Sequence, residues 1–473
     1  MNRYTNPRIL SLALTALLSY AAVAQVTTSQ SETETSSSRS TTKWRSSTGV
    51  TDFNIELRGK MEVTDDDKDI KSMSDDGYLE INKTVFGSKR TIIIESQGDG
   101  KLKKQYYEGR TEMKWEPSGR EWLAEILPEI VRNTAIGAES RVARFFKKGG
   151  TAAVLEEIRR MDSDHAKSIY AKVLMNQKVG INDYPLIINT LSSEIDSDHY
   201  MTEFLKSNTG KFLANTESSS ALFSATRNMD SDHYKTVVIK NALNGQMASL
   251  ANVKVILQAA GQMESDHYIT EVLTSLLKQD NLNEAVVSEM IATTAAIESD
   301  HYKTVVLSRA LDKPGLTAIS HQKVIESIKD IESDHYVTEV IKHLLENKLT
   351  DQLLSLLLDV MQSIESDHYR TDVLTKLMNR QDLTDAQFTV VLESTGSVES
   401  DHYLSTLLMN ALRQGELSDN QITTVINATK KIESDHYITQ VLVAAAPKVR
   451  SGNSVMKDAY RSAARNISSE TYY

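Results

Sequence analysis

The sequence predicts a mainly α-helical fold: a right-handed α-solenoid of about nine 34-residue helical-pair repeats, preceded by a small antiparallel β domain. Two observations support this prediction. The tripeptide Ser-Asp-His recurs nine times at steps of 33 or 34 residues, and a fixed period in this range is typical of solenoids. The segment before these repeats contains short β-rich runs separated by Asp- and Gly-rich turns, which is typical of an antiparallel meander.

The N-terminus has the features of an export signal. Arg3 and Arg8 supply positive charge, residues 9–20 form an apolar run too short to span a bilayer, and Ala22-Val23-Ala24 is a small-residue cleavage site. We therefore expect residues 1–24 to be a signal peptide and the protein to be exported, either to the periplasm or beyond. No later run has the length and apolarity of a membrane span, so we expect none.

Net charge and amino-acid composition indicate which kinds of binding partner the protein is suited to. The chain has 53 Lys and Arg against 64 Asp and Glu. Removal of residues 1–24 removes two arginines and no acid, so the net charge becomes 51 minus 64, or −13. An acidic exported protein is poorly suited to nucleic acid, and we expect no such partner. There is no cysteine, so stability must come from packing rather than disulfides.

The next three segments differ in composition and pattern. Residues 25–50 are rich in Ser and Thr and have few apolar side chains besides Trp44, which predicts a disordered linker. Residues 51–117 alternate apolar and polar side chains in short runs, which predicts the antiparallel β domain. Residues 118–160 are expected to form a helical connector, opened by a capping box of Ser118 and Glu121.

An acidic stretch within the β domain, residues 65–76, raises the question of calcium. Asp65, Asp67 and Asp69 have the spacing that begins a calcium loop, with Asp76 at its twelfth position. However, Ile70 stands where the loop needs glycine, and Asp76 replaces the usual bidentate glutamate. We favour an acidic hairpin turn and assign no metal-binding residue, leaving the calcium alternative open.

The repeats occupy residues 161–452, and residues 453–473 are expected to be a capping half-repeat with one apolar and one charged face. Each unit is expected to contain two helices, the second opened by the Ser-Asp-His motif. The motif histidines are His165, His199, His233, His267, His301, His335, His368, His402 and His436.

The motif has the composition of a turn that enters a helix. In the copy at residues 297–307, Ile297 ends the first helix, and Ser299 or Asp300 caps the second. Tyr302 then begins a stripe of apolar side chains, so we expect the tyrosine column to lie in the core. Tyr holds this position in eight of nine copies, with Ala166 the exception.

Two chemical interpretations of the motif are weaker. Consecutive helical residues point about 100° apart, so Ser299, Asp300 and His301 cannot line up as a hydrolase relay. A metal ladder would require histidines from helices about 8–10 Å apart to share ligand distances near 2.1 Å. Common catalytic motifs and cysteine nucleophiles are absent from the sequence. We therefore expect no enzyme, catalytic residue, metal site or cofactor, and favour a structural polar ladder.

Two resemblances add to this interpretation. The 34-residue period is that of tetratricopeptide repeats, but their Trp, Gly-Tyr and Pro positions are absent, and the copies look more like HEAT-type repeats. "TDDDKDIKSMSDDGYLEI", "EWLAEILPEIVRNTAIGAESRVARFFKKGGTAAVLEEI" and the "SD" starts resemble exported bacterial proteins that also occur joined to sensor peptidases of the kind that regulate β-lactamase. Covering residues 51–473, this resemblance implies an extracytoplasmic β-plus-solenoid module. It carries no catalytic residues, because the peptidase zinc motif and membrane helices are absent from this sequence.

The functional hypothesis follows from the predicted class of protein, an exported solenoid, rather than from a catalytic or binding motif. We expect an exported, non-enzymatic scaffold or solenoid of the cell envelope that binds a protein or peptide. The alternative is an extracytoplasmic sensor, or a module for a ligand such as a metal, with the β domain as its reader.

Overall fold

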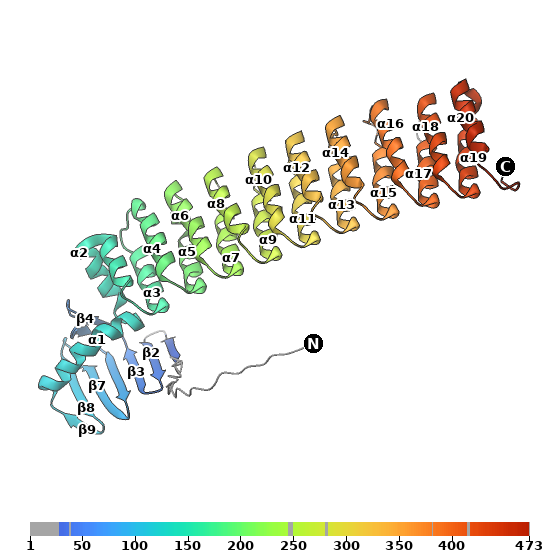
Figure 1. Ribbon diagram of the computed structural model, residues 1–473. Coiled ribbons are helices and arrows are strands. Elements are labelled where there is room, and N and C mark those ends of the chain that lie inside the picture. The colour runs from blue at the N-terminus through green and yellow to red at the C-terminus, as the bar shows by residue number, and fades with distance from the viewer. Residues whose placement is uncertain are drawn as a thin grey trace, which may run out of the picture. The chain divides into compact units, whose positions relative to one another are not determined.

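The computed structural model describes residues 28–36, 39–244, 249–279, 282–380, 382–413 and 417–472. The predicted signal peptide, residues 1–24, lies outside these ranges. The described residues form two compact units that divide between residues 178 and 179 (Figure 1). In the part of the chain that the structure describes, no helix is long and apolar enough to cross a membrane.

The first unit contains an antiparallel sheet, as the sequence predicts. Its seven strands have the order β1-β2-β3-β6-β7-β8-β9, and two short strands pair separately. The seven are β1 (Thr28–Ser36), β2 (Arg39–Thr48), β3 (Thr51–Arg58), β6 (Tyr78–Val85), β7 (Ser88–Ser96), β8 (Leu102–Glu108) and β9 (Thr111–Met113). The separate pair is β4 (Met61–Val63) and β5 (Ile70–Met73).

Strands β1 and β2 differ from the disordered linker expected over residues 25–50. Side-chain burial alone predicts disorder in this segment, but β2 pairs along β3 from Thr41 to Thr48 and satisfies backbone groups that would otherwise form an open edge. The one large apolar side chain, Trp44, packs edge-on against Phe53 of β3 with ring centroids 5.5 Å apart. Backbone pairing thus orders a segment that is too polar to form a core.

The core of this unit lies between one sheet face and helix α1 (Arg120–Thr134). Alternate strand residues such as Ile55, Ile81 and Ile92 pack with Leu123 and Ile126 of the helix. The expected capping box does not form: Ser118 lies in a short π-helical turn, η1 (Trp115–Gly119), and Gly119 is the N-cap residue. Helices α2 (Ala138–Ile158), with non-helical backbone at two consecutive glycines, and α3 (Asp164–Met175) follow.

The second unit is a two-layer helical solenoid, as predicted, and Figure 1 shows the layers side by side. One layer contains what we call the first helices: α4 (Tyr184–Glu194), α6 (Thr216–Ala225), α8 (Leu250–Ala260), α10 (Glu284–Thr293), α12 (Ala318–Ile328), α14 (Asp351–Met361), α16 (Asp385–Ser394), α18 (Asp419–Ala428) and α20 (Ser454–Ala464). The other contains the motif helices: α5 (Asp198–Phe212), α7 (Asp232–Leu243), α9 (Asp266–Leu277), α11 (Asp300–Leu311), α13 (Asp334–Leu344), α15 (Asp367–Met378), α17 (Asp401–Arg413) and α19 (Asp435–Ser451).

The first helices carry regular N-caps that the sequence analysis missed. At Asn283, for example, the side chain accepts a hydrogen bond of 2.9 Å from the backbone N–H of Val286. The same role recurs once per repeat at Asn215, Ser249, Asn283, Thr317, Thr350, Thr384, Ser418 and Asn453. The spacing of these Asn, Ser and Thr residues was the available signal.

The tyrosine column is not where the sequence analysis placed it. In α11, the buried stripe is Lys303, Val306, Leu307, Ala310 and Leu311, whereas Tyr302 is half-buried. The core stripe therefore begins one residue later than expected. The reason is that Asp300 is the first helical residue, and one step of about 100° turns the next side chain, rather than the tyrosine, toward the core.

Candidate functional site

The Ser-Asp-His motif begins each motif helix, but its serine seldom acts as a side-chain cap. Ser163 in the first unit accepts a hydrogen bond from the backbone N–H of Ala166. Ser231, Ser265, Ser299 and Ser333 occupy the N-cap position with extended backbone but make no side-chain capping bond. The expected capping role of the serine side chain is therefore wrong for these copies.

The motif aspartate instead bonds to the next repeat. Asp300 accepts hydrogen bonds from the backbone N–H groups of Glu332, at 3.3 Å, and Ser333, at 2.8 Å. The bond to the serine of the next copy recurs at 2.6–3.0 Å for Asp198, Asp232, Asp266, Asp300, Asp334, Asp367 and Asp401. We call these residues the aspartate ladder.

The last rung of this ladder uses the C-terminal segment. Asp435 accepts hydrogen bonds from the backbone N–H groups of Ser469, at 2.8 Å, and Ser468, at 3.2 Å. These bonds, the one from Ser469 first, lower the pKa of Asp435. The segment after α20 therefore reproduces the motif turn of one further repeat.

The histidine and tyrosine rings form a second ladder beside the first. His301 contacts its own neighbour Tyr302, with ring centroids 5.3 Å apart, and Tyr336 of the next repeat, at 5.8 Å. The same pair of contacts recurs from His199 to His436, and Tyr472 supplies the final ring, 5.6 Å from His436. The rings are edge-on or tilted, which is the favourable arrangement for aromatic pairs.

These contacts give the recurrence of the motif a structural reason. The ladder carboxylates accept backbone N–H groups, and the imidazoles lie against phenol rings, so the motif copies that the structure describes do not assemble a Ser-His-Asp relay. Among the described residues, no group of three or more His, Cys, Asp or Glu side chains could hold a metal ion.

The acidic turn at residues 65–76 is organised around cations of the chain. Both oxygens of Asp67 accept hydrogen bonds from arginines: Arg141 Nη2 lies 2.6 Å from Oδ2, and Arg144 Nη2 lies 2.6 Å from Oδ1. Asp69 pairs with Lys104 at 2.5 Å. Burial opposes ionisation of Asp67, but the two arginines outweigh it and lower the pKa of this carboxyl group. Two of the carboxylates in the calcium alternative therefore face the protein's own cations.

Arg141 is the centre of a buried network that the sequence analysis missed. Its guanidinium is fully buried and also donates to Glu157 Oε1, at 2.7 Å, and to the hydroxyl of Tyr170. Burial, opposed by Arg141, raises the pKa of Tyr170 to about 12. The network joins the turn of Asp67 to α2 and α3, and its completeness indicates a structural role.

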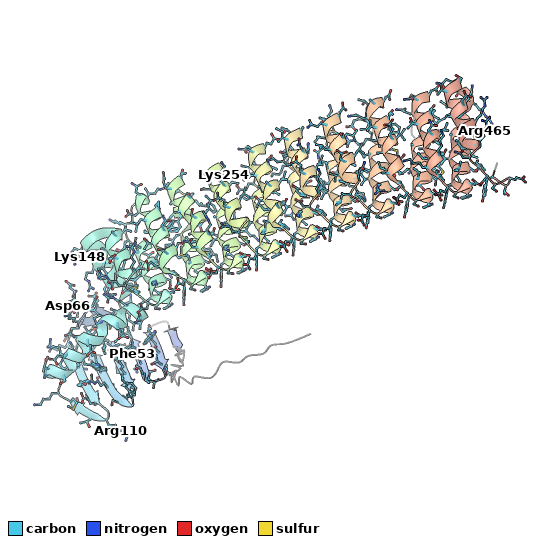
Figure 2. The ribbon with its side chains drawn as sticks, viewed as in Figure 1. Phe53, Asp66, Arg110, Lys148, Lys254 and Arg465 are labelled. Carbon is cyan, nitrogen blue, oxygen red and sulfur yellow. The ribbon has the colours of Figure 1, made fainter. Side chains whose placement is uncertain are left out.

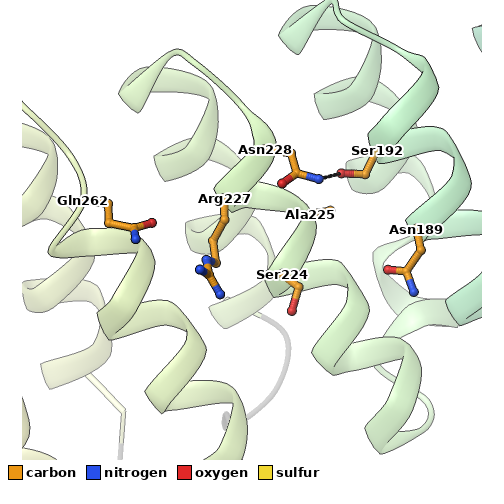
Figure 3. Close-up of a pocket in the computed structure, with 7 residues that line it drawn as sticks. All are labelled: Asn189, Ser192, Ser224, Ala225, Arg227, Asn228 and Gln262. Carbon is orange, nitrogen blue, oxygen red and sulfur yellow. Dashed lines mark hydrogen bonds between the residues drawn. The ribbon is translucent and has the colours of Figure 1, made fainter.

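The first helices form a groove on the surface of the second unit. Its first hollow, about 440 Å³, lies between α4 and α6 and is shown in Figure 3. Asn228 Nδ2 donates to Ser192 Oγ at 2.9 Å within it. The lining side chains are Asn189, Ser192, Ser224, Ala225, Arg227, Asn228 and Gln262.

A second hollow, about 540 Å³, lies between α8 and α10. Lys254, labelled in Figure 2, lines it together with apolar side chains such as Leu257 and Ala292. Gly261 lines this hollow and its neighbour Gln262 lines the first, so the two are adjacent. We call the pair the first-helix groove.

Comparisons with known proteins do not extend this picture. No protein-family model matches the chain, and no curated protein does. Among solved structures it is similar to one described as "Computational Design of Self-Assembling Cyclic Protein Homooligomers", at 12% identity over 71% of this chain and 89% of that chain. The TM-score of 0.09 is too low for this likeness to carry an argument.

Proposed function

We propose that this protein is an exported, non-enzymatic solenoid of the cell envelope that binds a protein or peptide along the first-helix groove. The observation that carries the proposal is the groove itself, which crosses four successive first helices. Export follows from the predicted signal at residues 1–24. The groove offers binding groups without a nucleophile and base in bonding contact, so its chemistry is recognition.

The lining suits a polypeptide. Asn189, Asn228 and Gln262 carry amide groups, each with both hydrogen-bond donors and an acceptor, which complement the alternating N–H and C=O groups of an extended backbone. The second hollow adds an apolar floor for a side chain. Repeat proteins present such extended surfaces because each repeat adds one increment of contact.

A second candidate function, a sensor with the β domain as reader, rests on the sheet face opposite α1. Tyr78 donates to Glu80 at 2.7 Å, and Asn82 donates to the other oxygen of Glu80 at 2.7 Å. Burial and this bond to Glu80 raise the pKa of Tyr78. Glu80 and Asn82, with Lys89 and Arg45, border a hollow of about 480 Å³ whose lining suits a small polar ligand.

Site-specific photo-crosslinking in the producing cell tests the first proposal. A photoreactive amino acid at Ser224, in the groove, should give a discrete adduct whose partner peptide is identified by mass spectrometry. Ser207, exposed on α5, provides the matched control and should give no such adduct. Equal adducts from both positions, or none from Ser224, would contradict binding in the groove.

A further inference from the structure

The first hollow of the groove contains a cation with no partner. Arg227 follows α6 in the short helix η3 (Thr226–Asn228), is exposed, and makes no ion pair or hydrogen bond through its side chain with any described residue. Figure 3 shows its guanidinium beside the hollow, between Gln262 and Ser224. None of the residues that line this hollow is an acid.

The chain as a whole is acidic, with 64 Asp and Glu against 53 Lys and Arg. Several of its arginines pair with acids, as Arg141 does with Asp67 and Arg120 with Glu116, whereas the hollow beside Arg227 has no acid in its lining. A guanidinium is always charged and presents a planar fork of donors that matches a carboxylate. An unpaired fork surrounded by amides and hydroxyls therefore selects a carboxylate that arrives with its own hydrogen-bonding groups.

The second hollow differs in chemistry. Leu257, Ala292, Ala295 and Ala296 give it an apolar wall, and Lys254 and Glu289 stand among its lining residues. Arg227 follows α6, and the second hollow lies between α8 and α10, so one to two helix spacings separate them. With packed helices about 8–10 Å apart, that distance is roughly 8–20 Å. An extended chain rises about 3.3 Å per residue, so roughly three to six residues span it.

We infer that the groove takes an extended acidic peptide segment, with an Asp or Glu carboxylate on Arg227 and a small or medium apolar side chain in the second hollow about three to six residues away. This inference rests on the proposed function and specifies its partner. The amides of Asn189, Asn228 and Gln262 hold the backbone next to the acidic residue.

Selection from a random displayed-peptide library against the full chain tests the inference. Selected peptides should be enriched in Asp or Glu, followed or preceded by an apolar residue at the stated spacing. The best of them, synthesised and labelled, should bind about tenfold more weakly to Arg227→Gln by fluorescence anisotropy. Lys278→Gln removes one positive charge from an exposed site at the end of α9 and should bind like the parent.

The outcomes separate the two proposals. Peptides that lack acidic enrichment, or that bind Arg227→Gln and the parent equally, overturn the acidic-peptide inference. If such peptides are still lost on Ser224→Trp, which fills the first hollow while circular dichroism reports a folded chain, the groove remains a peptide site. If no peptide is selected, or if Ser224→Trp leaves binding unchanged, both the inference and the proposed function fail.

Discussion

Asp300 shows at the scale of one residue why the motif recurs. Its carboxylate accepts two backbone N–H groups that belong to the turn of the next repeat, at Glu332 and Ser333. Those N–H groups precede a helix and have no partner within it. The aspartate therefore satisfies the exposed start of the next motif helix, while the negative charge also lies near the positive end of that helix.

Replacing Asp300 should weaken the contact between two repeats. We expect Asp300→Ala to lower the free energy of unfolding by about 1–3 kcal/mol, because it removes two charge-assisted hydrogen bonds and leaves their donors without an acceptor. Glu298→Ala removes an exposed acid two residues away and should change it by less than about 0.5 kcal/mol. Urea unfolding followed by circular dichroism measures both, and equal losses would show that the ladder adds nothing.

His321 on α12 should make the solenoid sensitive to acid. Burial lowers the pKa of this histidine, with Glu284 opposing, and Nε2 has no hydrogen-bond partner among the described residues. Because the folded pKa lies below the unfolded value of about 6.5, the unfolded state takes up the proton first. The resulting stability is complete above about pH 6.5 and is lost as the pH falls through that value.

The measurement is the thermal unfolding midpoint of the helices at about pH 8 and about pH 5. The parent should lose more stability on acidification than His321→Gln, since the variant lacks the buried titrating group. An identical pH dependence in the two proteins would show that His321 does not contribute to it.

At the scale of a helix, sequence periodicity predicted that the helices exist better than it predicted which face of each helix is buried. The helical pair and its motif start were recognisable because apolar residues recur at helical spacing. The helix face on which Tyr302 lies could not be predicted, because two stripes that start one residue apart fit helical spacing equally well. The bonds of the aspartate ladder could not be predicted for a different reason: donor and acceptor are 31–34 residues apart in the sequence, and only the packing of neighbouring repeats brings them together.

The position after the tyrosine shows a further regularity that only the fold makes meaningful. In the first eight copies it alternates between cationic and apolar side chains, namely Lys167, Met201, Lys235, Ile269, Lys303, Val337, Arg370 and Leu404, and the ninth copy, with Ile438, departs from the alternation. Lys303 Nζ donates to the carbonyl oxygen of Asp330 in the next repeat, at 3.0 Å, and Arg370 donates to that of Ser397. At these two copies the cationic side chain therefore adds a polar contact to the interface between neighbouring repeats.

The motif helices also bury hydroxyl groups that have no partner among the described residues. These are the Oγ1 atoms of Thr202, Thr236, Thr270, Thr304, Thr338 and Thr371. A buried hydroxyl without a hydrogen bond is destabilising, and valine has nearly the same shape. Thr236→Val should therefore leave the free energy of unfolding unchanged or raise it by up to about 2 kcal/mol.

Thr226 supplies the control for this substitution. It is equally buried, but its hydroxyl donates to the carbonyl oxygen of Phe223 at 2.6 Å, so Thr226→Val should lower the free energy of unfolding by about 0.5–1.5 kcal/mol. Both values come from urea unfolding. Comparable losses for Thr226→Val and Thr236→Val would mean that the Thr236 hydroxyl also has a partner, such as an ordered water molecule.

At the scale of the whole molecule, the two compact units are held together internally by different means. The first has a mixed core of sheet and helix with the buried cation Arg141, and the second has contacts between neighbouring repeats. In a solenoid each repeat is stabilised by its direct neighbours, so destabilising the first unit does not destabilise distant repeats. The sequence placed the start of the repeats at residue 161, whereas the two units divide after residue 178, so the first motif copy, with His165, belongs to the first unit.

The two units should therefore unfold separately, and the chain carries a probe for each. The three tryptophans, Trp44, Trp115 and Trp122, all lie in the first unit, whereas the helices of the second dominate far-ultraviolet circular dichroism. Fluorescence and dichroism should give different denaturation curves.

Arg141→Met should move only the fluorescence curve, because it leaves the buried carboxylates of Asp67 and Glu157 without this cation, at a cost of about 3–5 kcal/mol. Superimposable curves in the parent, or a variant that shifts both probes equally, would mean that the units unfold as one.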